Sequence, residues 1–284
     1  MISSAYRHLD TNTMPSVGGA GGEGARQQLL WRDDATGATV AINYGPAGFS
    51  SKLRELLDQG EHRHYHDTVN ERHYILGGDY RIWHYADTES EPTETFLRRH
   101  TYLENPPRTL HGSRPHSRPD YATTLLVWNN GCGTSIFDPA SRDETPHVPF
   151  GQPWPKVNHW SKPIIHHTME MPWTAHPAQP GWKMKFLSGA VERQAPAMLV
   201  SLPPDAGVTG APKIPGAALR WLYLLSGDLS VTMTAGGKTE TINLKEGHFL
   251  HWEKDAVLSF GPGAVSDGGC VSICVGHDLA GVRE

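Results

Sequence analysis

An internal repeat limits what this chain of 284 residues can fold into more than any other feature of its sequence. Met14-Pro15 and Met171-Pro172 are each followed, after the same interval, by a glycine that opens a strand-like segment. The hexapeptide Tyr-Ile-Leu-Gly-Gly-Asp at 74–79 is echoed by Tyr-Leu-Leu-Ser-Gly-Asp at 223–228. Self-similarity of this kind indicates two copies of one structural unit in a single chain.

Both copies have the pattern of short β-strands. Segments with strand-like alternation occur at 81–85 and 123–128 in the first copy, and at 229–233 and 271–275 in the second. The 30 glycines and 22 prolines suit many short strands that are joined by turns. We therefore predict an all-β fold.

A histidine-rich segment of the first copy carries the strongest chemical signal. Side chains alternate between the two faces of a strand, so His64 and His66 share one face and Tyr65 lies on the other. Glu71 follows at a distance that allows a tight bend and a return strand. Two imidazoles and a carboxylate directed at one point are suitable ligands for a divalent transition metal.

The spacing His-x-His-x4-Glu-x6-Gly, met here by His64, His66, Glu71 and Gly78, resembles the first motif of the cupin superfamily. The segment Asn-Pro-Pro-Arg-Thr-Leu-His at 105–111 resembles the second motif. The resemblance implies a double-stranded β-helix, or jelly-roll, barrel. It also implies that the histidine of the second motif, His111, is the fourth ligand of one divalent transition metal.

Together, the repeat and the resemblance imply two cupin barrels in one chain. We expect a metal-binding barrel at 1–137, a Pro-rich connector at 138–165 and a second barrel at 166–284. In the second copy, the positions that correspond to the four ligands carry no usual metal ligand; they fall at or near Lys213, Pro215, Arg220 and Leu258. The second barrel is therefore expected to be degenerate and to act as a structural or dimerising partner.

A narrower resemblance concerns the chemistry. The Met-Pro opening, the strand Leu-Leu-Trp-Arg-Asp at 29–33 and the Asn-Pro-Pro-x-x-x-His segment are similar to those of acetylacetone-type dioxygenases and of the cupin half of zinc-binding anti-sigma factors. The similarity implies an Fe(II) dioxygenase that cleaves a carbon–carbon bond in a small carbonyl or aromatic ketone substrate. Manganese, nickel and zinc accept the same ligands, so the ligands alone do not identify the metal.

Further site residues follow from strand alternation, which places Arg81, Trp83 and Tyr85 on one face and Tyr80, Ile82 and His84 on the other. One of these sets is expected to line the barrel. The residues nominated for substrate binding are Arg81, Trp83, Arg108 and Trp128. Arginines suit a carboxylate or enolate oxygen, and tryptophans suit an apolar or aryl group. The alternative for the aromatic residues is a place in the barrel core.

His73 and Tyr74, which follow Glu71 in the sequence, are nominated for catalysis. His73 shares the strand face of Glu71, which suits a general base or a residue that supports the ligands.

At 49–59, leucines at helical spacing predict a short amphipathic helix, either a lid over the barrel mouth or a cover for a sheet edge.

Composition excludes several classes of function. The formal net charge of -5 argues against a nucleic-acid groove, and no apolar run approaches the roughly 20 residues that cross a bilayer. With three cysteines and no evident signal peptide, we expect a cytoplasmic protein without a disulfide framework. The expected partner is a small-molecule substrate, and the resemblance is compatible with a monomer or a homodimer.

Two alternatives to the dioxygenase stay open at this stage. The first is a redox-neutral lyase, isomerase or hydrolase, in which the metal polarises a carbonyl group and a nearby side chain moves a proton. The second is a non-enzymatic ligand-binding protein with the same two barrels.

Overall fold

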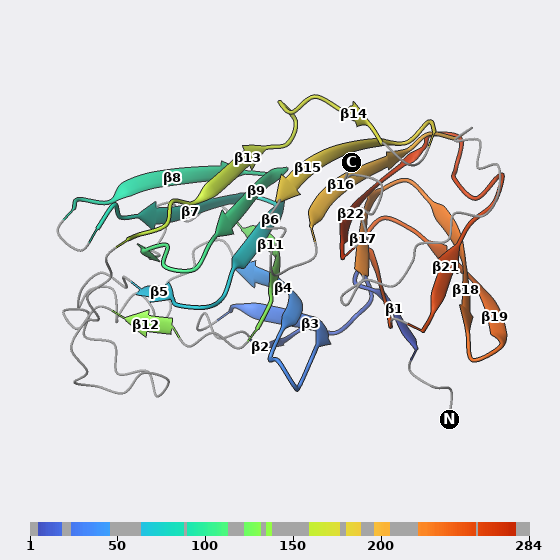
Figure 1. Ribbon diagram of the computed structural model, residues 1–284, viewed down its shortest axis with the longest axis horizontal. Coiled ribbons are helices and arrows are strands. Elements are labelled where there is room, and N and C mark those ends of the chain that lie inside the picture. Colours follow the sequence, from blue (N-terminus) through green and yellow to red (C-terminus); the bar gives the residue numbers. More distant parts are fainter. Residues whose placement is uncertain are drawn as a thin grey trace. The chain divides into compact units, whose positions relative to one another are not determined.

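The computed structural model describes residues 5–18, 24–45, 64–87, 90–112, 122–131, 135–137, 159–176, 180–188, 196–204, 221–253 and 255–276. Within these residues every regular element is a β-strand, and all pairing between strands is antiparallel (Figure 1). The predicted all-β fold is therefore confirmed for this part of the chain. The described residues include no helix that could span a membrane.

Contacts divide the chain into two compact units. The N-terminal unit comprises Pro15–Glu170, and the C-terminal unit comprises Met171–Glu284 together with Met1–Met14. The opening residues belong to the C-terminal unit because their strand β1 (Tyr6–Asp10) pairs with β20 (His248–Trp252). The sequence analysis had included these opening residues in the N-terminal barrel expected at 1–137.

The expected connector and helix are largely outside the described residues. Of the connector, the structure describes only 159–165, and the helix expected at 49–59 is not among the described residues. The strand β13 (Ile164–His167), at the expected start of the second barrel, pairs with β9 (Thr101–Asn105) of the N-terminal unit.

The N-terminal unit is built from two sheets. Their strand orders are β13-β9-β6-β11-β4-β3-β2 and β12-β5-β10-β7-β8. The strands not yet given bounds are β2 (Val17–Gly18), β3 (Arg26–Arg32), β4 (Thr39–Gly45), β5 (His64–His66), β6 (Glu71–Gly77), β7 (Asp79–His84), β8 (Thr93–Arg98), β10 (His111–Gly112), β11 (Thr123–Asn129) and β12 (Ser135–Phe137).

The C-terminal unit also has two sheets, ordered β1-β20-β17-β22-β16-β15-β14 and β19-β18-β21. Its remaining strands are β14 (Thr174–Ala175), β15 (Lys183–Ser188), β16 (Ala197–Leu202), β17 (Trp221–Ser226), β18 (Leu229–Ala235), β19 (Lys238–Leu244), β21 (Val257–Ser259) and β22 (Cys270–Val275).

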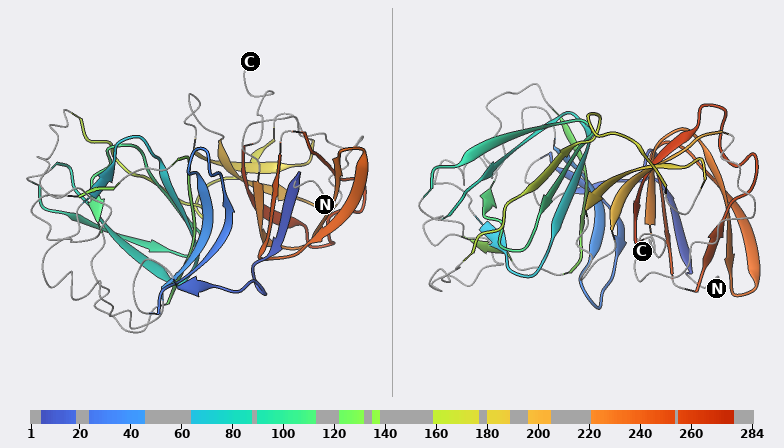
Figure 2. Two further views of the ribbon diagram at one scale, coloured as in Figure 1. Left: turned by 90° about the horizontal axis from the view of Figure 1, so that it is seen from below. Right: turned by 45° about the horizontal axis from the view of Figure 1, so that its top comes forward.

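In each unit the two sheets face each other across an apolar interior (Figure 2). In the N-terminal unit, Ile75 and Leu103 from one sheet pack against Ile82 and Leu97 from the other. The interior of the C-terminal unit includes Cys270 and Cys274. Burial raises the pKa of each of their thiols to about 12, so both cysteines act as small apolar residues.

The Gly-Asp turn that the repeat shares is a backbone requirement in both units. Gly78 and Gly227 both have positive φ angles, of 68° and 77°. A Cβ atom on Gly227 would lie 2.1 Å from the carbonyl oxygen of Gly269, and one on Gly78 would lie 1.6 Å from that of Ala122. Only glycine avoids both the strained φ and the overlap with the backbone.

We expect Gly227→Ala to lower the free energy of unfolding of the C-terminal unit by more than about 2 kcal/mol, because strain and a backbone clash combine. Gly237→Ala is the matched control, since Gly237 has a φ of 75° but open space around its Cβ position. It should lose only about 1 kcal/mol. Urea unfolding of both variants measures the difference, and equal losses would contradict the role of the close approach.

Candidate metal centre

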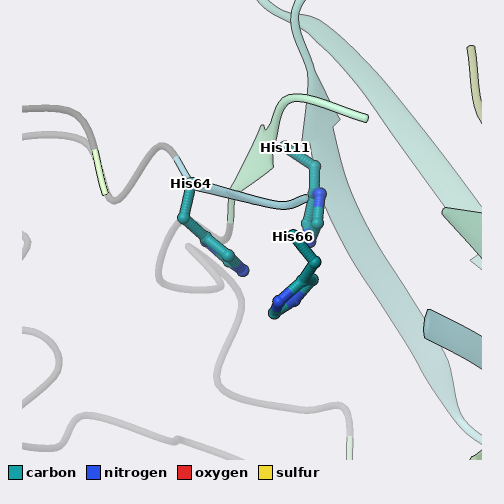
Figure 3. A group of neighbouring side chains, drawn as sticks. All are labelled: His64, His66 and His111. Atoms are coloured by element: carbon teal, nitrogen blue, oxygen red, sulfur yellow. The ribbon is translucent and has the colours of Figure 1, made fainter. Parts of the chain in front are cut away.

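Three histidines of the N-terminal unit converge on one point (Figure 3). His64 and His66 share a face of β5, and His111 on β10 pairs directly with His64 across the two antiparallel strands. One ring nitrogen from each of the three lies within 4.8 Å of the other two. This group, His64–His66–His111, is called the histidine triad below.

The loop before His111 determines which of its ring nitrogens is available. The Nδ1 atom lies 2.8 Å from the carbonyl oxygen of Thr109, which can only accept, so Nδ1 carries the proton. The Nε2 atom faces the other two histidines and lies 3.1 Å from Oε2 of Glu71. In the neutral ring, Nε2 carries the lone pair that a divalent metal would take in place of that contact.

Glu71 reaches the same point from the facing sheet. Its Oε2 atom lies 3.1 Å from Nε2 of His111, and its Oε1 atom lies 3.3 Å from Nε2 of His73. Burial alone would raise the pKa of Glu71, but the charge and hydrogen-bond contacts of His73 and His111 outweigh it and hold this pKa well below its usual range. The structure thus places an ionised carboxylate beside the triad, although Glu71 is not part of the group of mutually close ligand atoms.

Three further polar residues face this interior. The sequence analysis named Tyr80 and His84 only as part of one of two possible lining faces, and it gave Asn105 no role. Tyr80 stacks edge-on against His73, with ring centroids 5.7 Å apart, and burial together with the charge of Glu71 raises its pKa. His84 pairs in register with His111, and burial lowers its pKa to about 4. Asn105 pairs in register with Glu71 and is 1% exposed. Strand alternation on β7 was the available signal for Tyr80 and His84. The place of Asn105 opposite Glu71 depends on strand register, which the sequence does not show.

The face of β7 that carries Arg81 and Trp83 points away from the triad. Arg81 forms a 2.7 Å salt bridge with Glu94. Trp83 packs in a cluster with Tyr65, on the side of β5 opposite the ligand histidines. The inward face of β7 is the other set, Tyr80, Ile82 and His84, because Ile82 belongs to the interior core.

Three other nominated residues also lie off the triad. Tyr74 and Trp128 occupy the face of their sheet opposite Glu71; the Tyr74 hydroxyl lies 3.2 Å from that of Thr168, and Trp128 contacts the ring of Tyr102. Arg108 forms a 2.7 Å salt bridge with Asp67 in which both side chains are about half exposed. Of the two residues nominated for catalysis, only His73 lies beside Glu71.

Arg108 nevertheless supports the site through its backbone. Its N–H group donates to the carbonyl oxygen of His66 at 2.7 Å, which ties the second motif to the first. Its carbonyl oxygen accepts a bond from the N–H group of Ser161, and the preceding Trp160 packs on Tyr65 with ring centroids 5.2 Å apart. Residues 160–161 thus hold both ligand-bearing segments from behind.

The C-terminal unit offers no comparable group among its described residues. Leu258, which corresponds to His111 in the repeat, is 1% exposed and belongs to the apolar core. Lys213, Pro215 and Arg220, which correspond to the other ligands, lie outside the described residues.

The donor set of the triad fits a divalent transition metal. Imidazole nitrogen is a ligand for zinc, iron, nickel and copper, and three such donors leave coordination positions for a reactant. The ionised carboxylate beside His111 adds the negative charge that such an ion favours. The triad could therefore hold one divalent metal.

Comparisons with known proteins support the fold. Neither known family models nor curated protein sequences match this chain. Protein Ylba from E. coli is similar in structure, with a TM-score of 0.57 and 10% identity over 97% of this chain and 93% of that chain.

Oxalate decarboxylase from Bacillus subtilis is also similar, with a TM-score of 0.57 and 14% identity over 95% of this chain and 76% of that one. A further structure of that enzyme, described by its Mn(II) centres, has a TM-score of 0.56 at 14% identity, over 95% of this chain and 77% of that one. At these identities the likeness concerns the fold alone.

We expect the purified protein to bind about one divalent metal per chain, and His64→Ala or His111→Ala to weaken binding at least about tenfold, because each removes a ligand. Elemental analysis after loading with Mn(II), Fe(II) or Zn(II) gives the stoichiometry, and a competition titration gives the affinity. His248→Ala, in the C-terminal unit, is the control. About two metals per chain, or full binding by the triad variants, would contradict the assignment.

Proposed function

We propose that the protein is a metal-dependent enzyme that acts on a small carbonyl compound bound at the histidine triad. The observation that carries the proposal is the meeting of three imidazole nitrogens, within 4.8 Å of one another, with the ionised carboxylate of Glu71. A purely structural metal site usually has four protein ligands and no open position. Here the triad supplies three nitrogens, and the neighbouring groups are suited to proton transfer.

When bound, a divalent metal supplies Lewis-acid polarisation of a carbonyl or enolate oxygen. The other work falls to the side chains. Glu71, held in its ionised form, takes up a proton from the substrate, and His73, 3.3 Å from it, shares that proton. Tyr80, whose pKa is raised, remains a neutral phenol that can donate a hydrogen bond.

For the reaction, we propose first an Fe(II) dioxygenase that cleaves a carbon–carbon bond in a small carbonyl or aromatic ketone. The support is the similarity of 29–33 and of the Asn-Pro-Pro-x-x-x-His segment to acetylacetone-type dioxygenases. In such a reaction both atoms of O2 enter the products and no external reductant is consumed.

A redox-neutral lyase, isomerase or hydrolase is the second candidate, and the proton-transfer groups favour it. Glu71, His73 and Tyr80 form a contiguous set of an acceptor, a shuttle and a donor beside the triad. Such a set supports removal of a proton next to a carbonyl group and its return to another atom. The similar protein oxalate decarboxylase has Mn(II) centres, so manganese belongs in the test with iron and zinc.

For the architecture, we propose that each unit is a cupin barrel. The proposal is supported by two facing sheets in each unit and by the shared glycine turn. The metal site then belongs to the N-terminal barrel alone.

Turnover of β-dicarbonyls, hydroxyketones and small carboxylates, assayed with and without O2 and with each metal, tests the function. The dioxygenase predicts O2 uptake with Fe(II) and none with Zn(II), and the second candidate predicts product without O2. In either case His66→Ala and His111→Ala should reduce the rate to that of the metal-free protein, because the triad is incomplete. Turnover that persists in both variants would contradict the proposed site.

A further inference from the structure

We propose that a directional chain of hydrogen bonds through Thr95, His84 and Asn105 positions the Glu71 carboxylate beside the histidine triad. Asn105 and His84 are thereby assigned as positioning residues. The inference deepens the proposed function and depends on it for the part played by the metal. The hydrogen-bond chain itself can be tested on the metal-free protein.

The chain crosses the interior from one sheet to the other. Thr95 Oγ1 lies 3.3 Å from Nδ1 of His84, and Nε2 of His84 lies 3.1 Å from Oδ1 of Asn105. Nδ2 of Asn105 lies 3.2 Å from Oε2 of Glu71. His84 and Asn105 are 7% and 1% exposed, so the contact between them is shielded from water.

The chemistry of the groups determines the direction of every bond. The NH2 group of Asn105 is turned toward Glu71 and donates to its Oε2 atom. Its carbonyl oxygen then faces His84 and can only accept, so His84 must carry a proton on Nε2. In a neutral imidazole Nδ1 is then an acceptor, and the hydroxyl group of Thr95 donates a hydrogen bond to it.

This arrangement holds Glu71 without neutralising it. Oε2 is contacted by Asn105 and His111, and Oε1 by His73, so rotation of the carboxylate would break contacts at both oxygens. A lysine or arginine in place of Asn105 would also hold it but would cancel its charge. A neutral amide, itself oriented by neutral His84, leaves the negative charge available to the metal and to the reacting group.

The register of the strands makes Asn105 suitable for this task. Asn105 pairs with Glu71 across β9 and β6, and His84 pairs with His111 across β7 and β10. The chain therefore connects two residues that each lie opposite a residue of the metal centre. Replacement of Asn105 should therefore change metal binding at the triad.

The first test is the tautomer of His84. Long-range 15N–1H correlation spectra of the metal-free and the zinc-loaded protein, with the signals assigned by comparison with His84→Gln, should show the proton on Nε2 in both states at neutral pH. A proton on Nδ1, or an imidazolium ion, would overturn the proposal.

The second test compares matched variants by competition titration with Zn(II) and Mn(II) and by the EPR spectrum of bound Mn(II). Asn105→Leu should weaken metal binding by about 10- to 100-fold and change the spectrum, because Glu71 loses its donor. Thr95→Val should cause a smaller loss of the same kind, and the proton of His84 should stay on Nε2, because the carbonyl oxygen of Asn105 still accepts from it.

Thr101→Val is the matched control, since Thr101 makes a hydroxyl–imidazole contact of the same length, 3.3 Å, to His167 on β13. It should leave metal binding unchanged. An equal loss in the control, or unchanged binding in folded Asn105→Leu, would overturn the proposal. If Asn105→Leu does not fold, the tautomer of His84 in the wild-type protein still tests the proposal. Wild-type protein that binds no metal but carries the Nε2 proton would refute the proposed function and leave the hydrogen-bond chain standing.

Discussion

The pairing of His111 with His64 across β10 and β5 is the constraint on which the candidate site depends. Antiparallel neighbours that face each other bring their side chains to the same side of the sheet, so one backbone register aligns two ligands from segments far apart in the sequence. The third, His66, follows from strand alternation alone. The bond from Arg108 N–H to the carbonyl oxygen of His66 then holds the two segments together.

The charged and polar groups beside the triad come from the facing sheet. Glu71, His73 and Asn105 lie on β6 and β9, whereas the triad lies on β5 and β10. Packing of the two sheets around Ile75, Ile82 and Leu103 therefore brings the carboxylate to the imidazoles. In this unit the apolar core and the candidate metal centre are two parts of one interior.

Residues whose role depends on spacing within one segment could be predicted from the sequence. The ligand pair His64 and His66, and the glycine turns at Gly78 and Gly227, are of this kind, because strand alternation and positive φ are local properties. The choice between the two faces of β7 could not be predicted. Alternation defines both faces equally well, and the packing of Trp83 against Tyr65 turned the Arg81 side outward. Asn105 was missed because nothing within its own segment indicates that Glu71 lies opposite.

The sequence by itself predicted an all-β fold, a repeated strand–turn pattern, and a set of histidines in the first copy suited to a metal. These properties follow from periodicity and residue chemistry over short distances. Only the tertiary structure decided that β1 joins the sheet of the C-terminal unit, and which polar side chains surround the triad. Both depend on register between strands that are distant in sequence, and that register is set by the summed packing of whole sheets rather than by any one segment.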